Sequence, residues 1–165
     1  MLDTNQKNSQ KNNLNRESDQ FIIFTLQDKE FGINVLDSRE IITAGDLTTI
    51  PESPNFVKGV INLRDQIIPI IDLNKRFKLQ GEMDHQQDKV IIISVNNTLI
   101  GLGVKEVKEI LRIDPDNISE APEITKGVDK NYIQGIARMD ARLLILIDIE
   151  KIFSESEIDK LQDLE

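Results

Sequence analysis

The stretch that decides the fold is residues 55–77, with the sequence NFVKGVINLRDQIIPIIDLNKRF. In it the apolar runs VINL and IIPII flank the polar triplet RDQ, a pattern typical of a β-hairpin. Pro69 inside the second run indicates an edge or a bulge, because proline has no amide hydrogen to donate to a sheet. Asp72 ends the second strand at a position suited to cap a short helix over residues 73–77. The segment therefore predicts two strands around a tight turn, followed by one turn of helix.

The same pattern returns in residues 131–153, NYIQGIARMDARLLILIDIEKIF, which align with residues 55–77 without gaps. The identical positions are Asn55, Gly59, Ile71, Asp72, Lys75 and Phe77, matched by Asn131, Gly135, Ile147, Asp148, Lys151 and Phe153. Residues 21–42 and 90–111 align as well, in the same order along the chain. We interpret this as a duplication with repeat units over about residues 21–77 and 90–153.

A repeat unit of about 60 residues is marginal alone, so we expect the two units to bury a shared interface and fold as one body. A residue found in both copies then serves the fold, whereas a residue found in one copy is a candidate for a specialised role. Asp72 and Asp148 end apolar strands, where catalytic carboxylates often lie. Because both copies have them, we favour the helix-cap interpretation.

Similar pairs of short runs predict hairpins over residues 21–33, 90–104 and 136–147. Helix is expected only in short segments after strands and at the C-terminus, residues 154–165, where Ser154 and Glu157 have capping-box spacing. Residues 1–18 are polar and lack periodicity, so we expect a disordered tail. The predicted fold class is all-β, built from small barrels or a sandwich.

Composition excludes several classes of function. The chain has 165 residues, 20 Lys plus Arg and 29 Asp plus Glu, and a net charge of −9. Without a basic cluster such a chain would repel a phosphate backbone, so no nucleic-acid partner is expected. There is no cysteine and no apolar run of the ~18 residues that a membrane span needs. The first twenty residues lack an apolar segment, so we expect that they are not a signal peptide. We expect a soluble cytoplasmic protein with no direct membrane insertion.

The sequence gives little support for an enzyme. The single histidine, His85, lies in a polar stretch with two carboxylates, which favours a solvated linker over a metal site. The Gly101-Leu-Gly103 segment lacks the third glycine of a dinucleotide site. No Ser/His/Asp set is plausible, and no spacing singles out a pair of carboxylates. We therefore predict no catalytic residue, no metal and no cofactor.

One hairpin end differs between the copies. Asn62 and Arg64 align with Arg138 and Asp140, so the charge pattern at this turn is not shared. The end of this hairpin is a candidate contact surface. The alternative is an ordinary solvent-facing arginine at a turn.

These residues resemble the CheW family of bacterial chemotaxis coupling proteins. The segments that carry the resemblance are FVKGVINLR (56–64), IIPIIDL (67–73), FTL (24–26), FGI (31–33), REI (39–41) and LILIDIEK (144–151). The resemblance implies two five-stranded SH3-like β-barrels packed together around a further hydrophobic core, in a domain over residues 19–153. It also implies a non-catalytic adaptor that links methyl-accepting chemotaxis receptors to the histidine kinase CheA, which carries a regulatory domain of the same fold, in membrane-associated arrays.

The resemblance assigns contact residues to two partners. Those that would face the receptor are Glu40, Arg64, Asn62, Gly59, Val35, Leu36 and Ile41, the last three lining a groove for the receptor's helical tip. Those that would contact the kinase are Val107 and Ile110. One departure is Asp65, where the family usually has glycine. Aspartate tolerates the left-handed conformation better than most residues, so the turn can form.

Other functions stay open at this point. A CheW-like scaffold could serve a different receptor–kinase pathway, such as one for motility or development. A small-molecule-binding β protein would place its site between the two barrels. A hydrolase with paired carboxylates is the third alternative.

Overall fold

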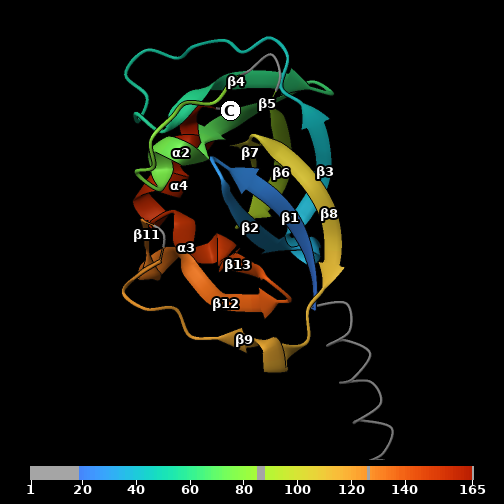
Figure 1. The fold of residues 1–165 in the computed structure, drawn as a ribbon. Helices are drawn as coiled ribbons and strands as arrows, with labels where there is room; N and C mark the ends of the chain where they lie inside the picture. Colours follow the sequence, from blue (N-terminus) through green and yellow to red (C-terminus); the bar gives the residue numbers. More distant parts are fainter. Residues whose placement is uncertain (1–18, 85–87, 126, 165) are drawn as a thin grey trace, which may run out of the picture.

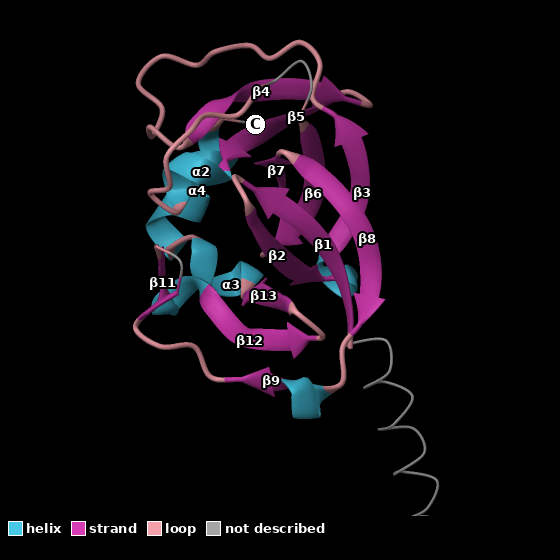
Figure 2. Ribbon diagram, in the orientation of Figure 1, coloured by secondary structure: helices cyan, strands magenta, loops and turns pink. Residues whose placement is uncertain are grey.

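The computed structural model describes residues 19–84, 88–125 and 127–164. Its strands form two large sheets, which define two subdomains (Figures 1 and 2). The expectations for residues 1–18 and for His85 lie outside the described residues. The predicted all-β class, with two β subdomains, short helices and a C-terminal helix, is confirmed. None of the described helices has the length and apolar character needed to cross a membrane.

Subdomain 1 is a five-stranded sheet. Its strands, in spatial order, are β3 (Ser38–Thr43), β6 (Lys89–Val95), β7 (Thr98–Val104), β5 (Gln66–Asp72) and β4 (Val57–Leu63). Subdomain 2 is a six-stranded sheet. Its strands are β8 (Glu106–Arg112), β1 (Gln20–Leu26), β2 (Lys29–Asn34), β13 (Arg142–Ile147), β12 (Ile133–Met139) and the two-residue β9 (Ile118–Ser119).

The remaining elements are short. They comprise the pair β10 (Ile124–Thr125) and β11 (Val128–Asp129), the 3-10 turns η1 (Val35–Asp37), η2 (Pro115–Asn117) and η3 (Lys130–Tyr132), and the helices α2 (Leu73–Arg76), α3 (Ile149–Ile152) and α4 (Glu155–Asp163). All four predicted hairpins are confirmed, as β1–β2, β4–β5, β6–β7 and β12–β13. Asp72 and Asp148 cap α2 and α3 through their carboxylates, as predicted. Ser154 and Glu157 form the predicted capping box at the start of α4.

The two repeats exchange hairpins. The β1–β2 hairpin of the first repeat lies in subdomain 2, and the β6–β7 hairpin of the second repeat lies in subdomain 1. The registers agree with the sequence alignment: Ile70 lies opposite Gly101 in one parallel strand pair, and Leu146 lies opposite Gly32 in the other. Each subdomain is therefore built from both repeats, which explains why neither unit is expected to fold alone.

Three apolar cores follow from the alternation of side chains along the strands. Phe21 and Ile23 of β1 face a small core inside subdomain 2, whereas Ile22 and Phe24 face the large core shared by both subdomains. In subdomain 1 the strands β5 and β6 divide their side chains in the same way between their own core and the shared one. Strands buried on both faces account for the nearly continuous Ile and Val runs.

Pro69 lies in β5 between two neighbouring strands, so it is not on a sheet edge. It pairs with Val60 of β4, while the parallel ladder to β7 begins only at Ile70. In the other subdomain the equivalent residue, Ile145, is inside the ladder to β2. The missing amide hydrogen of proline is thus accommodated because the ladder to β7 starts one residue after it.

Candidate functional site

Arg64 and Glu40 form a bidentate ion pair. Arg64 Nη1 donates to Glu40 Oε1 at 3.1 Å, and Nη2 donates to Oε2 at 2.9 Å. The Arg64 side chain is 75% exposed, whereas that of Glu40 is 26% exposed. A guanidinium held in this fork has a fixed direction even though it lies at the surface.

The local fold explains how these two residues meet. Arg64 and Asp65 are the two residues of the β4–β5 turn, and both have positive φ, 51° and 65°. Such two-residue turns match the twist of the hairpin strands. Since β3 and β4 are the outer strands of the five-stranded sheet, an ion pair between β3 and the turn after β4 means that the sheet curls until its two edges approach each other.

Asn62 and Gly59 lie on β4 but differ in exposure. Asn62 is exposed beside the turn. Gly59 is buried at a bulge, where an added Cβ would lie 2.7 Å from the carbonyl oxygen of Thr48. Gly59 therefore presents no side chain to the surface, and its role in this geometry is to shape the strand that carries Asn62.

The exposed large apolar side chains of the described chain are Leu36, Ile41 and Ile110. Leu36 lies on η1, Ile41 on the edge strand β3, and Ile110 on the edge strand β8. Ile41 and Ile110 occupy equivalent positions in the two repeats. Val35 and Val107 are partly buried and pack against the shared core.

A groove of about 450 Å³ lies between the two subdomains. Its lining includes Ile41 and Thr43 of β3 and Glu106 and Val107 of β8. The two edge strands run side by side on the right of Figure 1. Ile41 and Val107, which the resemblance assigns to different partners, thus line the same groove.

The equivalent end of subdomain 2 has an ion-pair cluster that sequence reasoning missed. Arg142 donates from Nη2 to Glu30 Oε2 at 2.6 Å and from Nη1 to Glu109 Oε1 at 3.4 Å. The hydrogen bond from Arg142 holds the pKa of Glu30 below its ordinary value, although burial opposes the shift. The sequence offered one signal, because Glu109 aligns with Glu40 in the repeat. The arginine that pairs with Glu109, Arg142, lies two positions after the residue that aligns with Arg64, so the alignment did not reveal the pair.

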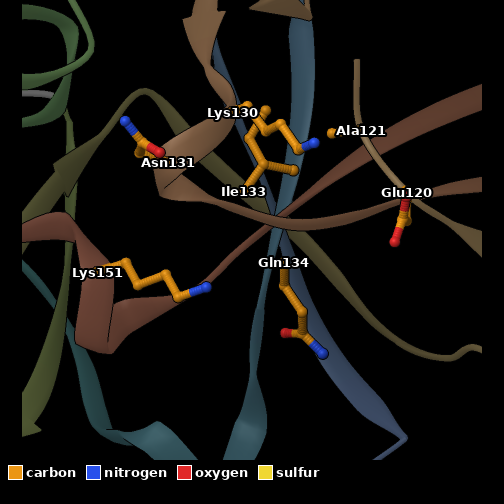
Figure 3. A pocket seen from close by; sticks show the side chains of 7 residues that line it. All are labelled: Glu120, Ala121, Lys130, Asn131, Ile133, Gln134 and Lys151. Atoms are coloured by element: carbon orange, nitrogen blue, oxygen red, sulfur yellow. The ribbon is translucent and has the colours of Figure 1, made fainter. Parts of the chain in front are cut away.

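A second hollow, on subdomain 2, is open and lined mainly by polar residues. This hollow, of about 520 Å³, is lined by Glu120, Ala121, Lys130, Asn131, Ile133, Gln134 and Lys151. In Figure 3 the polar side chains are spread around this space and do not converge on one point. Within residues 19–84, 88–125 and 127–164, no group of His, Cys, Asp and Glu is placed to hold a metal ion.

A paired-sheet body with exposed apolar side chains on two sheet edges, Ile41 on β3 and Ile110 on β8, fits the class of protein-binding scaffolds. The model of the CheW-like domain matches residues 20–157, and the chain accordingly belongs to the CheW family. It is 37% identical over 139 residues to the chemotaxis protein CheW of Klebsiella aerogenes, covering 84% of each chain. It is 32% identical over 155 residues to that of Treponema pallidum, covering 92% of this chain and 91% of the relative.

The crystal structure of the scaffolding protein TtCheW from Thermoanaerobacter tengcongensis has the same fold. The TM-score is 0.77 at 32% identity, over 85% of this chain and 90% of that one. Like these relatives, the chain is a non-catalytic chemotaxis scaffold.

Proposed function

We propose that the chain couples methyl-accepting chemotaxis receptors to the histidine kinase CheA. The observation that carries this proposal is the placement of the exposed apolar side chains. Ile41 lies on β3, the strand that carries Glu40, Leu36 lies on η1 just before that strand, and Ile110 lies on β8 of subdomain 2. An adaptor needs two such surfaces on one rigid body.

The receptor surface comprises η1, β3 and the β4–β5 turn. An apolar face of a receptor helix would contact Val35, Leu36 and Ile41, while the Arg64–Glu40 pair would fix its register through hydrogen bonds. Asn62 adds a polar group beside Arg64. Both charges are already paired in the free protein, so a receptor must match the pair rather than a single charge.

The kinase surface comprises β8, with Ile110 exposed and Val107 partly buried. CheA would bind here through its regulatory domain. Receptor state would then bias kinase state because the two partners contact one body and their binding energies are coupled. Individually weak contacts suffice when many copies are held in an array at the membrane.

The alternatives receive less support. The interior between the subdomains is filled by the large shared core, and the groove that remains between them is the open one at β3 and β8. A scaffold for another receptor–kinase pathway would use the same two surfaces, and only the identity of the partners distinguishes it.

Reconstitution tests the proposal. The chain is mixed with the CheA and a receptor signalling fragment from the same genome, and CheA autophosphorylation is measured with and without it. We expect receptor-dependent activation only when all three are present. Activation that is independent of the chain, or no binding to either partner, would overturn the proposal.

A further inference from the structure

Arg76, the last residue of α2, uses all of its guanidinium nitrogens. Nη1 and Nη2 donate to the two carboxylate oxygens of Glu157 on α4, at 2.7 and 2.8 Å. Nε donates to the carbonyl oxygen of Ile152 on α3, at 2.8 Å. Arg76 and Glu157 are both mostly buried.

Three aromatic rings surround the same guanidinium. Its central carbon lies 4.8 Å from the ring centre of Phe56, 5.3 Å from that of Tyr132 and 5.4 Å from that of Phe153. Each distance is within the range of a cation–π contact. The guanidinium is therefore held by hydrogen bonds to its nitrogens and by contacts with the three aromatic rings.

The groups around Arg76 come from both subdomains. Phe56 and α2 flank strands of subdomain 1, whereas Tyr132, Ile152 and Phe153 flank strands of subdomain 2. Ile152 is also the residue that aligns with Arg76 in the other repeat. Arg76 thus lies where the two repeats meet, and only one copy has a cation there.

This contact lies across the molecule from the groove between β3 and β8. In Figure 1 the helices are on the left and the two edge strands on the right. The shared core lies between the subdomains, and apolar contacts of this kind are not directional. A forked, fully hydrogen-bonded arginine is directional, so it can select one orientation among those that the core tolerates.

We infer that Arg76 is a positioning residue that fixes the angle between the two subdomains and thereby the width of the groove between β3 and β8. The claim that Arg76 fixes this angle and this width does not depend on the proposed function. The consequence for receptor binding rests on the proposed function, which places the receptor on the β3 side of this groove and the kinase on the β8 side.

Because the chain has no cysteine, two introduced cysteines are the only sites that a thiol-reactive spin label can modify, and the distance between the subdomains can be measured directly. Single cysteines replace Arg39 on β3 and Lys108 on β8, two exposed residues that flank the groove on opposite sides. Nitroxide labels on this pair report the distance distribution between the subdomains by pulsed electron paramagnetic resonance. The matched variants are Arg76→Met, Arg76→Lys and Lys75→Met, the last removing an exposed cation from the same helix.

We expect Arg76→Met to shift or broaden the distribution, Lys75→Met to leave it unchanged, and Arg76→Lys to restore it in part. Each distance distribution is measured under conditions in which circular dichroism shows that the variant is folded. If Arg76→Met does not fold, Glu157→Gln replaces it, since the glutamine loses the charge but keeps the size, and the same broadening is expected. A distribution in either variant equal to that of the parent would overturn the inference.

Receptor affinity of the same variants separates this inference from the proposed function. A changed distance distribution with weaker receptor binding supports both. A changed distribution with unchanged receptor binding supports the positioning role and contradicts the assignment of the β3 side of the groove to the receptor.

Discussion

The β4–β5 end of subdomain 1 and the β12–β13 end of subdomain 2 are equivalent hairpin ends in the two repeats but carry different charges. In subdomain 1 a single carboxylate, Glu40, pairs with Arg64, whose side chain is 75% exposed. In subdomain 2 two carboxylates share Arg142, whose side chain is 33% exposed. Arg64 ties its hairpin end to the edge strand β3, and Arg142 ties its own to the inner strand β2 and the edge strand β8, so an ion pair here serves the fold in each copy.

This difference in exposure indicates which of the two ion pairs a partner protein can contact. Arg142 is surrounded by its two acceptors, whereas Arg64 presents most of its surface to solvent. We therefore expect changes at Arg64 to affect coupling more than stability, and changes at Arg142 to do the reverse.

The largest expected effect is the loss of coupling in Arg64→Glu. The new carboxylate faces Glu40 and inverts the charge offered to the receptor, and like charges across an interface cost enough to weaken binding by about tenfold or more. Receptor-dependent CheA autophosphorylation is the measurement. Arg138→Glu, the same charge change at an exposed position of the equivalent hairpin, is the control and should couple normally. Normal coupling in Arg64→Glu would show that the receptor surface is elsewhere.

The second comparison concerns stability. Arg142→Met leaves Glu30 and Glu109 without their shared cation, so we expect the free energy of unfolding to fall by about 1–2 kcal/mol. Arg64→Met breaks a more exposed pair, for which we expect about 0–1 kcal/mol. Urea unfolding of both variants checks the order. A larger loss of unfolding free energy for Arg64→Met would contradict the view that Arg142 serves stability and Arg64 serves partner binding.

Sequence reasoning found what depends on local pattern. The four hairpins, the aspartate caps of α2 and α3 and the capping box at Ser154 are set by residues close together in the chain, and all were predictable. The exchange of hairpins between the subdomains was not, because two-residue periodicity says which face is buried but not which sheet a hairpin joins.

The same limit applies to the site. Glu30 and Arg142 are 112 residues apart, and nothing in either segment predicts that the parallel pairing of β2 with β13 brings them together. Glu40 and Arg64 were reached through a family motif, whereas their mutual ion pair became visible only in three dimensions. Arg76 was missed because an arginine in a one-turn helix is ordinarily solvated.

The third prediction compares two glutamates that align in the repeats. Glu40→Ala should weaken receptor binding a few-fold, by less than about 1.4 kcal/mol, because it frees Arg64 from its fixed orientation. Glu109→Ala should leave receptor binding unchanged, since Arg142 keeps Glu30. Isothermal titration with a receptor fragment measures both. Equal losses at the two positions would mean that the copies are not specialised.

The fourth prediction uses pH to sharpen the stability comparison. Arg142 lowers the pKa of Glu30 from its ordinary 4.5, so the pair stabilises the fold above that pH and loses this contribution as the pH falls through the lowered value. The difference in unfolding free energy between the parent and Arg142→Met should therefore shrink below pH 4.5. Urea unfolding at several pH values measures it, and a difference that is constant down to acid would argue that Arg142 acts by packing alone.

The smallest expected effect is at Asp65, the turn residue beside Arg64. Its φ of 65° suits glycine, so Asp65→Gly should change the free energy of unfolding by no more than about 1 kcal/mol, with relief of the left-handed strain offset by the greater freedom of the unfolded chain. Asp65→Asn tolerates the same conformation but removes the charge. If the carboxylate competes with the receptor for Arg64, both variants should bind the receptor more tightly. If only Asp65→Gly binds more tightly, the shape of the turn controls affinity, and the comparison between the two hairpin ends reduces to backbone geometry rather than charge.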